Sequence, residues 1–218
     1  MKKTLAILLP LGFAALLLLN SCLGVSADIS IRKDGSGRIA LEYRVSQVLE
    51  SMGRLDGNAR RPAIPVGRAD FERSLARIPG LRLVSHKTKD VPNAAGGRDL
   101  RTTAVLEFRD TAALLAFLDS SGGGATLTQK DGKNLLRLVF RDSSAAIDNA
   151  DLKSLLKEIS AGYGINVSLR APAGARITTF PPSVPAATIV SGGKKVSFSI
   201  GVADFIDLDD GLTLEIAW

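Results

Sequence analysis

Few side chains of this sequence could carry chemistry, and each of them stands alone. Cys22 is the only cysteine and His86 is the only histidine in 218 residues. One thiol cannot form a disulfide within the chain, and one histidine cannot build a histidine-rich zinc site. A serine triad would need a presented nucleophile beside His86, and the sequence has no G-x-S-x-G turn. We therefore expect His86 to lie on the exposed face of a strand, opposite Leu83.

Four aspartates near the C-terminal end form the one acidic cluster, at positions 204, 207, 209 and 210. Calcium is bound by several oxygen ligands at short spacing. Asp204, Asp207, Asp209 and Asp210 do not match the helical calcium loop, because Gly211 stands where that loop needs Asp or Asn. The cluster therefore predicts a charged loop before the last strand and no metal site.

Three glycine-rich runs, at 35–37, 122–124 and 192–193, could suggest phosphate-binding loops. None has the G-x-x-x-x-G-K-[ST] order that cradles a phosphate, so they are interpreted as turns. Without a triad, a metal cluster or a phosphate loop, the sequence indicates a non-enzymatic protein with no cofactor.

The N-terminal segment determines what Cys22 means. Lys2 and Lys3 precede an apolar run from Leu5 to Leu19. A helix needs about 20 apolar residues to cross a bilayer, so this run is short for a permanent span. Two lysines followed by a short apolar stretch are typical of an export signal peptide.

The residues at the end of this signal resemble the bacterial lipobox, through Leu19, small Ser21 and Cys22 itself. The resemblance implies cleavage between Ser21 and Cys22, a diacylglyceryl group on the Cys22 sulfur, and further acylation, for example with palmitate, on the new amine. Two or more acyl chains make a stable anchor, whereas one chain binds only reversibly. Leu23 follows in place of the aspartate that signals inner-membrane retention, which favours the outer membrane of the cell envelope.

A second cleavage site competes with the first. Val25-Ser26-Ala27 fits the small-residue pattern of ordinary signal peptidase. Cleavage after Ala27 would release a soluble periplasmic protein that starts at Asp28, for which a hydrolase is one interpretation. A third interpretation is a lipoprotein with a structural or surface-antigen role.

Charge is distributed unevenly along the exported chain. Residues 28–109 hold 16 basic and 10 acidic side chains, and residues 110–218 hold 10 and 12. A basic first half could lie against anionic lipid headgroups, or it could simply be a solvated surface. Nucleic acid is a poor partner for an exported protein, and we expect none.

The elements that must position these residues follow from hydrophobic periodicity and turn signals. We expect a hairpin over 28–46, helices over 47–55 and 68–78, and strands at 81–91, 98–109, 125–129 and 134–141. A third helix should be capped by Asp110 and stopped by the glycines at 122–124, and a fourth should start at Asp148 or Asn149 and end before Gly162. After residue 165 we expect strands alone, at 165–170, 175–180, 187–191, 195–201 and 211–217. The fold class is therefore α+β, a mainly antiparallel sheet with about four helices packed on it.

The predicted domain organisation is simple. Residues 1–21 are a signal peptide, residues 22–27 a lipidated linker, and residues 28–218 one ectodomain, with 28–145 and 146–218 as an alternative division into subdomains. The loop from Thr179 to Pro185 is rigid and partly apolar, so Phe180 and Val184 are candidates for contact with a ligand.

The layout as a whole is similar to that of the LppM-like bacterial lipoproteins. It combines the lipobox cysteine, the early turn Asp34-Gly35-Ser36-Gly37 and a late β region with Ala171-Pro172-Ala173-Gly174. The resemblance implies an envelope protein with an α+β ectodomain, of a kind for which lipid or glycolipid binding has been considered. The working hypothesis is a non-enzymatic, membrane-anchored lipoprotein that binds an envelope lipid or protein partner.

Overall fold

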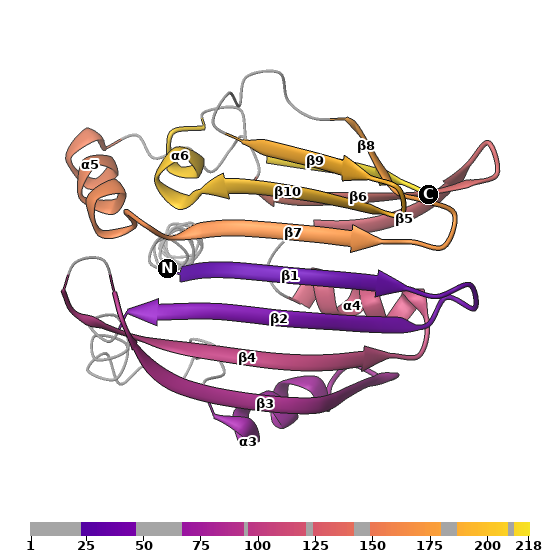
Figure 1. Cartoon of the computed structure of the whole chain (residues 1–218), viewed down its shortest axis with the longest axis horizontal. Coiled ribbons are helices and arrows are strands. Elements are labelled where there is room, and N and C mark those ends of the chain that lie inside the picture. The colour runs from indigo at the N-terminus through magenta and orange to yellow at the C-terminus, as the bar shows by residue number, and fades with distance from the viewer. Residues whose placement is uncertain are drawn as a thin grey trace, which may run out of the picture.

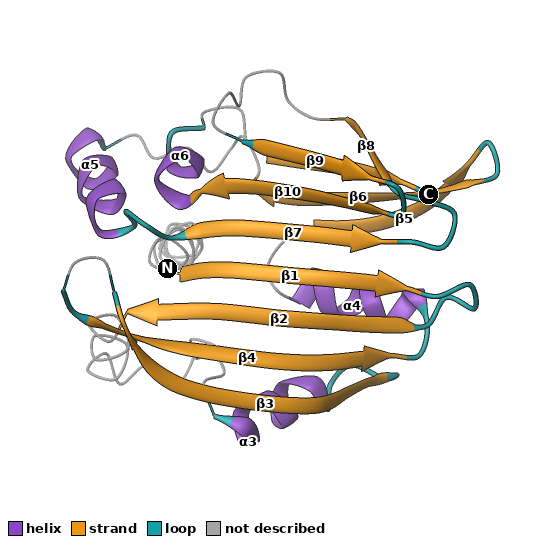
Figure 2. Cartoon of the chain, viewed as in Figure 1, coloured by secondary structure: helices purple, strands orange, loops and turns teal. Residues whose placement is uncertain are grey.

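The computed structural model describes residues 23–46, 67–93, 96–120, 124–141, 149–179, 187–208 and 212–218. Within these ranges the chain forms two β-sheets and four helices (Figures 1 and 2). In chain order the elements are β1 (Leu23–Ile31), β2 (Gly37–Ser46), α3 (Arg68–Leu75), β3 (Leu81–Pro92), β4 (Arg98–Phe108), α4 (Thr111–Ser120), β5 (Gly124–Lys130), β6 (Lys133–Arg141), α5 (Ala150–Ile159), β7 (Gly164–Arg170), β8 (Arg176–Thr179), β9 (Thr188–Gly192), β10 (Lys195–Gly201), α6 (Val202–Ile206) and β11 (Leu212–Ala217).

The larger sheet has seven strands in the order β3-β4-β2-β1-β7-β10-β9, with β1 at its centre. All neighbours are antiparallel except β1 and β7, which run in the same direction with Val25 opposite Ile165. Side chains alternate between the two faces of each strand, so one face collects Ile29, Ile39 and Leu106 and becomes the core face. The other face is mainly polar.

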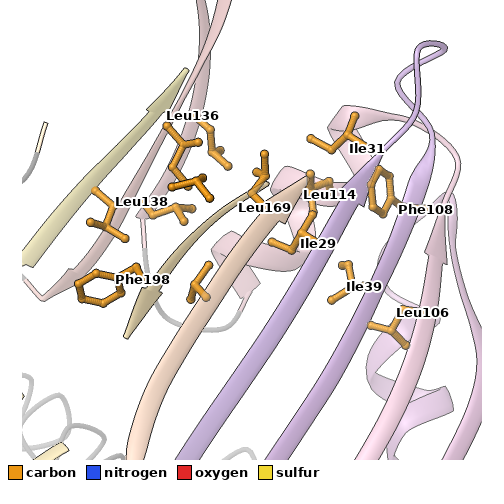
Figure 3. Close-up of a cluster of buried hydrophobic side chains, with 14 of the residues drawn as sticks. Ile29, Ile31, Ile39, Leu106, Phe108, Leu114, Leu136, Leu138, Leu169 and Phe198 are labelled. Carbon is orange, nitrogen blue, oxygen red and sulfur yellow. The ribbon is translucent and has the colours of Figure 1, made fainter. Parts of the chain in front are cut away.

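The smaller sheet, β5-β6-β11-β8, lies behind one half of the larger sheet, and α4 lies behind the other half (Figure 1). Its apolar residues meet those of the larger sheet in a single core. Figure 3 shows Leu136 and Leu138 of β6 facing Phe198 and Leu169 of the larger sheet. Both sheets combine strands from before and after position 145, so the described residues share one core.

The helices α3 and α4 cover the core face as the sequence predicted. Phe71, Leu75 and Ile78 are all buried, and Leu114 of α4 is only 2% exposed. Asp110 begins α4 by accepting a hydrogen bond from the Ala113 amide at 2.9 Å, which satisfies one of the free amides of the first turn. The predicted α+β class is therefore confirmed, although a second sheet covers half of the core face.

The remaining two helices lie at one end of the larger sheet and not on its face (Figure 2). Asn149 caps α5 by accepting from the Leu152 amide at 2.9 Å. α6 corrects the expectation of strands alone after residue 165. It forms because Val202 and Ile206, four residues apart, bury one side against Leu156 of α5.

The first hairpin also differs from the prediction. β1 begins at Leu23, five residues before the predicted hairpin, so residues 23–27, expected as a linker, are paired strand. The helix predicted over 47–55 lies outside the described residues. None of the described helices has the length and apolar character needed to cross a membrane.

Candidate functional site

Most of the residues predicted to have a functional role lie outside the described part of the chain. Ser21 and Cys22, the predicted cleavage and lipidation residues, lie outside it, and so do Phe180 and Val184 of the predicted contact loop. Leu23 immediately follows Cys22 and is the first residue of β1. The lipidation site, if used, is thus joined to the central strand of the larger sheet.

His86 lies on the core face of β3, which corrects the expected exposed position. A β-bulge between Leu83 and Ser85 adds one residue to the strand, so His86 pairs with Ala104 and shares its face with Leu83. Its ring packs on Phe71 with the ring centroids 5.1 Å apart, and Nε2 is buried without a hydrogen bond. A histidine in this position packs against α3, and it lines neither of the two hollows described below.

Within the acidic cluster, Asp207 has a structural role. Its carboxylate accepts from Lys157 of α5 and lies 3.6 Å from Nζ of Lys153. The hydrogen bond from Lys157 is the main reason why the pKa of Asp207 is lowered from its ordinary value. These ion pairs hold α6 against α5. Asp209 and Asp210 lie outside the described residues.

Residues at the end of the molecule toward which β1 runs line a pocket of about 760 Å³. Figure 1 shows how β1 runs toward that end. We call this pocket the end pocket. It is built by the β1–β2 turn, the start of α4, the β5–β6 turn, the β7–β8 loop, the β9–β10 turn and the last residues of β11. Its described lining consists of Ile31, Arg32, Lys33, Gly35, Thr111, Gly132, Lys133, Asn134, Pro172, Ala173, Gly174, Ala175, Arg176, Gly193, Ala217 and Trp218.

Local hydrogen bonds fix the loops that form this pocket. The Arg32 amide donates to the Ser36 carbonyl at 2.8 Å, and Asp34 accepts from both the amide and the hydroxyl of Ser36. Those bonds from Ser36 lower the pKa of Asp34 below its ordinary value, so its carboxylate stays ionised at neutral pH. The turn is therefore a closed unit that projects Arg32 and Lys33.

The β7–β8 loop and the β9–β10 turn, which also line the pocket, lie close to each other. Gly174 has φ of +88°, and a Cβ added there would lie 3.2 Å from the Gly193 carbonyl oxygen, so the β7–β8 loop and the β9–β10 turn are in near contact. At the pocket floor, Trp218 and Asn134 exchange two backbone hydrogen bonds of 2.9 and 3.0 Å. The pocket is thus preformed by backbone contacts between segments distant in sequence.

The charge of the end pocket is strongly one-sided. Four lining side chains are cationic: Arg32, Lys33, Lys133 and Arg176. No carboxylate side chain is among the described residues that line the pocket. Three of the four cations, all but Arg32, make no hydrogen bond or ion pair with a described residue. Three aspartates adjoin the lining in sequence, at positions 34, 110 and 131, but none of them is part of it. Apolar surface comes from Ile31 and Trp218, so the pocket can hold an anionic group next to an apolar one.

A second hollow of about 410 Å³ lies on the open polar face of the larger sheet, but its polar groups are already paired. Asn166 donates to Ser26 at 3.1 Å and accepts from Ser199 at 2.5 Å. Asp28 accepts from Ser168 at 2.8 Å and from Lys195 at 2.6 Å. Because these groups satisfy one another, the hollow offers a ligand less than the end pocket does.

Comparison with known proteins gives a structural likeness and no sequence match. No family model matches the chain, and no curated protein matches it. The fold is similar to the NMR structure of the folded domain of LppM from Mycobacterium tuberculosis. The two share 11% sequence identity and a TM-score of 0.44, over 89% of this chain and 88% of that one. A likeness this weak describes layout and carries no functional argument.

The sequence reading missed the end pocket as a site. Its cations come from three separate segments, the β1–β2 turn and the first residues of β6 and β8, and no short motif connects Arg32 with Lys133 or Arg176. The sequence contained only an indirect signal of this pocket. Both turns singled out for the resemblance, 34–37 and 171–174, contribute to this one pocket.

Proposed function

We propose that this chain is an envelope lipoprotein, anchored through acylated Cys22, whose folded part binds an amphiphile with an anionic headgroup, most simply an envelope lipid. The observation that carries the proposal is the end pocket, where four cations and apolar surface converge in about 760 Å³. Small-molecule sites commonly have volumes of roughly 300–1,000 Å³ with a few convergent polar groups. Phosphate oxygens are the usual partners of such lysine and arginine side chains.

A binding role suits the lining better than a catalytic one. Nucleophilic catalysis needs a nucleophile within hydrogen-bond reach of a base. The described lining offers the Thr111 hydroxyl but no histidine, cysteine or carboxylate side chain to activate it. The chemistry available there is charge neutralisation and apolar contact, which is the chemistry of holding a ligand.

The position of β1 supports cleavage before Cys22 over cleavage after Ala27. Residues 23–27 pair with β2 along their whole length, from Leu23 opposite Val45 to Ala27 opposite Leu41. Residues 25–27 also pair with β7. Cleavage after Ala27 would remove more than half of the central strand, whereas cleavage before Cys22 would leave it whole.

The anchor is tested by metabolic labelling. Cells expressing the full chain or Cys22→Ala are grown with labelled palmitate, and the immunoprecipitated proteins are compared. The proposal predicts label on the wild type and none on the variant. Equal labelling of both would exclude Cys22 as the acylated residue, and absence of label from both, or a mature N-terminus at Asp28 by sequencing, would support the soluble alternative.

The ligand is tested by extracting lipid from the purified protein and identifying it by mass spectrometry. We compare the wild type with a Lys33→Gln/Arg176→Gln double variant, and use Lys87→Gln, an exposed cation on β3, as the matched control. Anionic lipid should accompany the wild type and the control and be depleted from the double variant. Equal lipid content in all three, or a protein crosslinked at the end pocket in place of lipid, would contradict the proposed ligand.

A further inference from the structure

Helix α5 carries a hydrophobic pair that the fold leaves exposed. Leu155 is 53% exposed and Ile159 is 43% exposed, whereas Leu156 on the neighbouring side of the helix is 5% exposed. Residues four apart lie on the same side of a helix, so the two exposed side chains form one apolar ridge. Their spacing is that of an apolar helix face, yet both side chains keep about half of their surface exposed.

The ridge is at the same end of the molecule as the start of β1. α5 ends at Ile159, and the chain then turns into β7, which begins at Gly164 and runs parallel to β1. A Cβ placed on Gly24 would lie 3.3 Å from the ring of Tyr163, so this turn touches the first residues of β1. Figure 1 shows α5, α6 and the start of β1 together at one end. We call this the anchor end.

No linker separates the predicted acylation site from the folded part of the protein. Cys22 directly precedes Leu23, the first residue of β1, and consecutive Cα atoms are about 3.8 Å apart. An acylated Cys22 must therefore draw the anchor end to the bilayer surface. The end pocket is at the other end of β1, whose nine residues span about 30 Å at roughly 3.3 Å per residue.

We propose that Leu155 and Ile159 contact the surface of the bilayer that holds Cys22, so that the molecule stands on its anchor end with the end pocket facing away from that bilayer. The proposal rests on the lipid anchor of the proposed function. It adds that the ligand enters from the aqueous side and is not taken directly from the anchoring membrane.

The charges around the ridge limit how deeply it enters. Lys153 and Lys157, on the side of α5 that faces α6, are engaged by Asp207. Asp151, four residues before Leu155, and Glu158, three residues after it, are exposed and border the ridge on the outer side of the helix, so their charges must stay in water. The ridge therefore lies at the level of the lipid headgroups, the depth at which an amphipathic helix rests on a membrane.

The test uses the acylated full-length lipoprotein in vesicles. Because Cys22 is the only natural cysteine and its sulfur is acylated, Leu155→Cys and Ala173→Cys each offer one free thiol for an environment-sensitive fluorophore. The vesicles contain phosphatidylcholine and phosphatidylglycerol brominated on the acyl chain near the headgroup. We expect bromine to quench the label at position 155 and to leave the label at position 173, in the end pocket, unquenched.

A matched pair of charge variants tests the ridge itself. Ile159→Asp added to the labelled Leu155→Cys protein should abolish most of the quenching, whereas Ser154→Asp, on the outer side of the same helix, should leave it unchanged. Loss of quenching with both would indicate a general charge effect and would overturn a specific ridge contact.

The two proposals fail in different ways. A protein that does not float with the vesicles would overturn the anchor and this orientation together. If the protein floats with the vesicles, three results would overturn the orientation alone. The first is an unquenched label at position 155, and the second is equal quenching at both positions. The third is a label at position 155 that is dehydrated but unquenched, because protein covers it.

Discussion

At the scale of single residues, Gly37 shows how closely the first hairpin meets the core. A Cβ at Gly37 would lie 2.0 Å from the Ser30 carbonyl oxygen and 2.3 Å from Cζ of Phe108. Neither the backbone of β1 nor a fully buried phenylalanine can move away at low cost. Glycine is therefore required here by close approach.

We predict that Gly37→Ala lowers the free energy of unfolding by about 1–3 kcal/mol or more, the usual cost of overfilling a packed site. Gly192→Ala is the control, since nothing lies within 4 Å of a Cβ at that position. Urea unfolding of both variants provides the measurement. A Gly37→Ala protein as stable as Gly192→Ala would show that the start of β2 packs differently.

Asp28 connects three neighbouring strands through Lys195 and Ser168, so the stability of the fold should depend on pH. Partial burial alone would raise the pKa of Asp28, but hydrogen bonds from these two residues outweigh it and leave the pKa below its ordinary value. A carboxyl group with a lowered folded-state pKa contributes stability above its unfolded pKa. That contribution is lost as the pH falls through the folded value.

Asp28→Asn should therefore reduce stability at neutral pH, and the difference from the wild type should shrink as the pH falls below about 4. Asp119→Asn, an exposed aspartate of α4, should show no such convergence. Thermal unfolding between pH 2 and 7 measures both. A difference that is constant over this range would contradict a stabilising charge on Asp28.

Predictability from sequence at this scale depended on how local the cause was. Asp110 was recognised as a helix cap, and the start of α5 was narrowed to Asp148 or Asn149, because capping needs only the next three residues. The predicted position of His86 was wrong because a β-bulge shifts which side chains of β3 face the core, and the residues Val84-Ser85-His86 contain no signal of a bulge. The cations of the end pocket were individually visible, but their convergence depends on the whole fold.

At the scale of elements, β1 determines where the folded part of the protein begins. It is paired on both sides, by β2 and β7, and it is the fourth of seven strands. Residues 23–27 supply five of the nine pairs with β2. A chain that starts at Asp28 would leave the facing parts of β2 and β7 without these partners.

We predict that a chain starting at Asp28 is markedly less stable than one starting at Leu23. Because each kcal/mol lost lowers the Tm of a domain of this size by about 2–4 °C, a fall of roughly 10 °C or more is expected. Circular dichroism melting of the two purified chains tests this. Equal Tm values would make cleavage after Ala27 structurally acceptable and would weaken the case for the lipid anchor.

Most described elements could be predicted, and the partners of the strands could not. The turn at Asp131-Gly132, with φ of +52° and +70°, marks the β5–β6 hairpin in the sequence itself. By contrast, the pairing of β6 with β11 joins segments about seventy residues apart, and it creates the second sheet. α6 was missed because its five apolar-rich residues directly follow β10 and resemble more strand.

At the scale of the whole molecule, the sheet has two chemically different ends. The anchor end carries the start of β1 and the apolar ridge of α5. The other end carries four cations around an apolar-floored pocket. A single strand, β1, runs from one to the other (Figure 1). This polarity would place a ligand site in the aqueous space above the anchoring membrane.

The central claim, that the end pocket binds an anionic amphiphile, is tested most directly by the fluorescence of Trp218. It is the only tryptophan in the chain, and it lines the pocket. The protein is titrated with short-chain phosphatidylglycerol and, separately, with short-chain phosphatidylcholine, both kept monomeric. We predict a saturable change with phosphatidylglycerol that weakens with salt, disappears in Lys33→Gln/Arg176→Gln and persists in Lys87→Gln. Equal responses to the two lipids, or an unchanged response in the double variant, would contradict the claim.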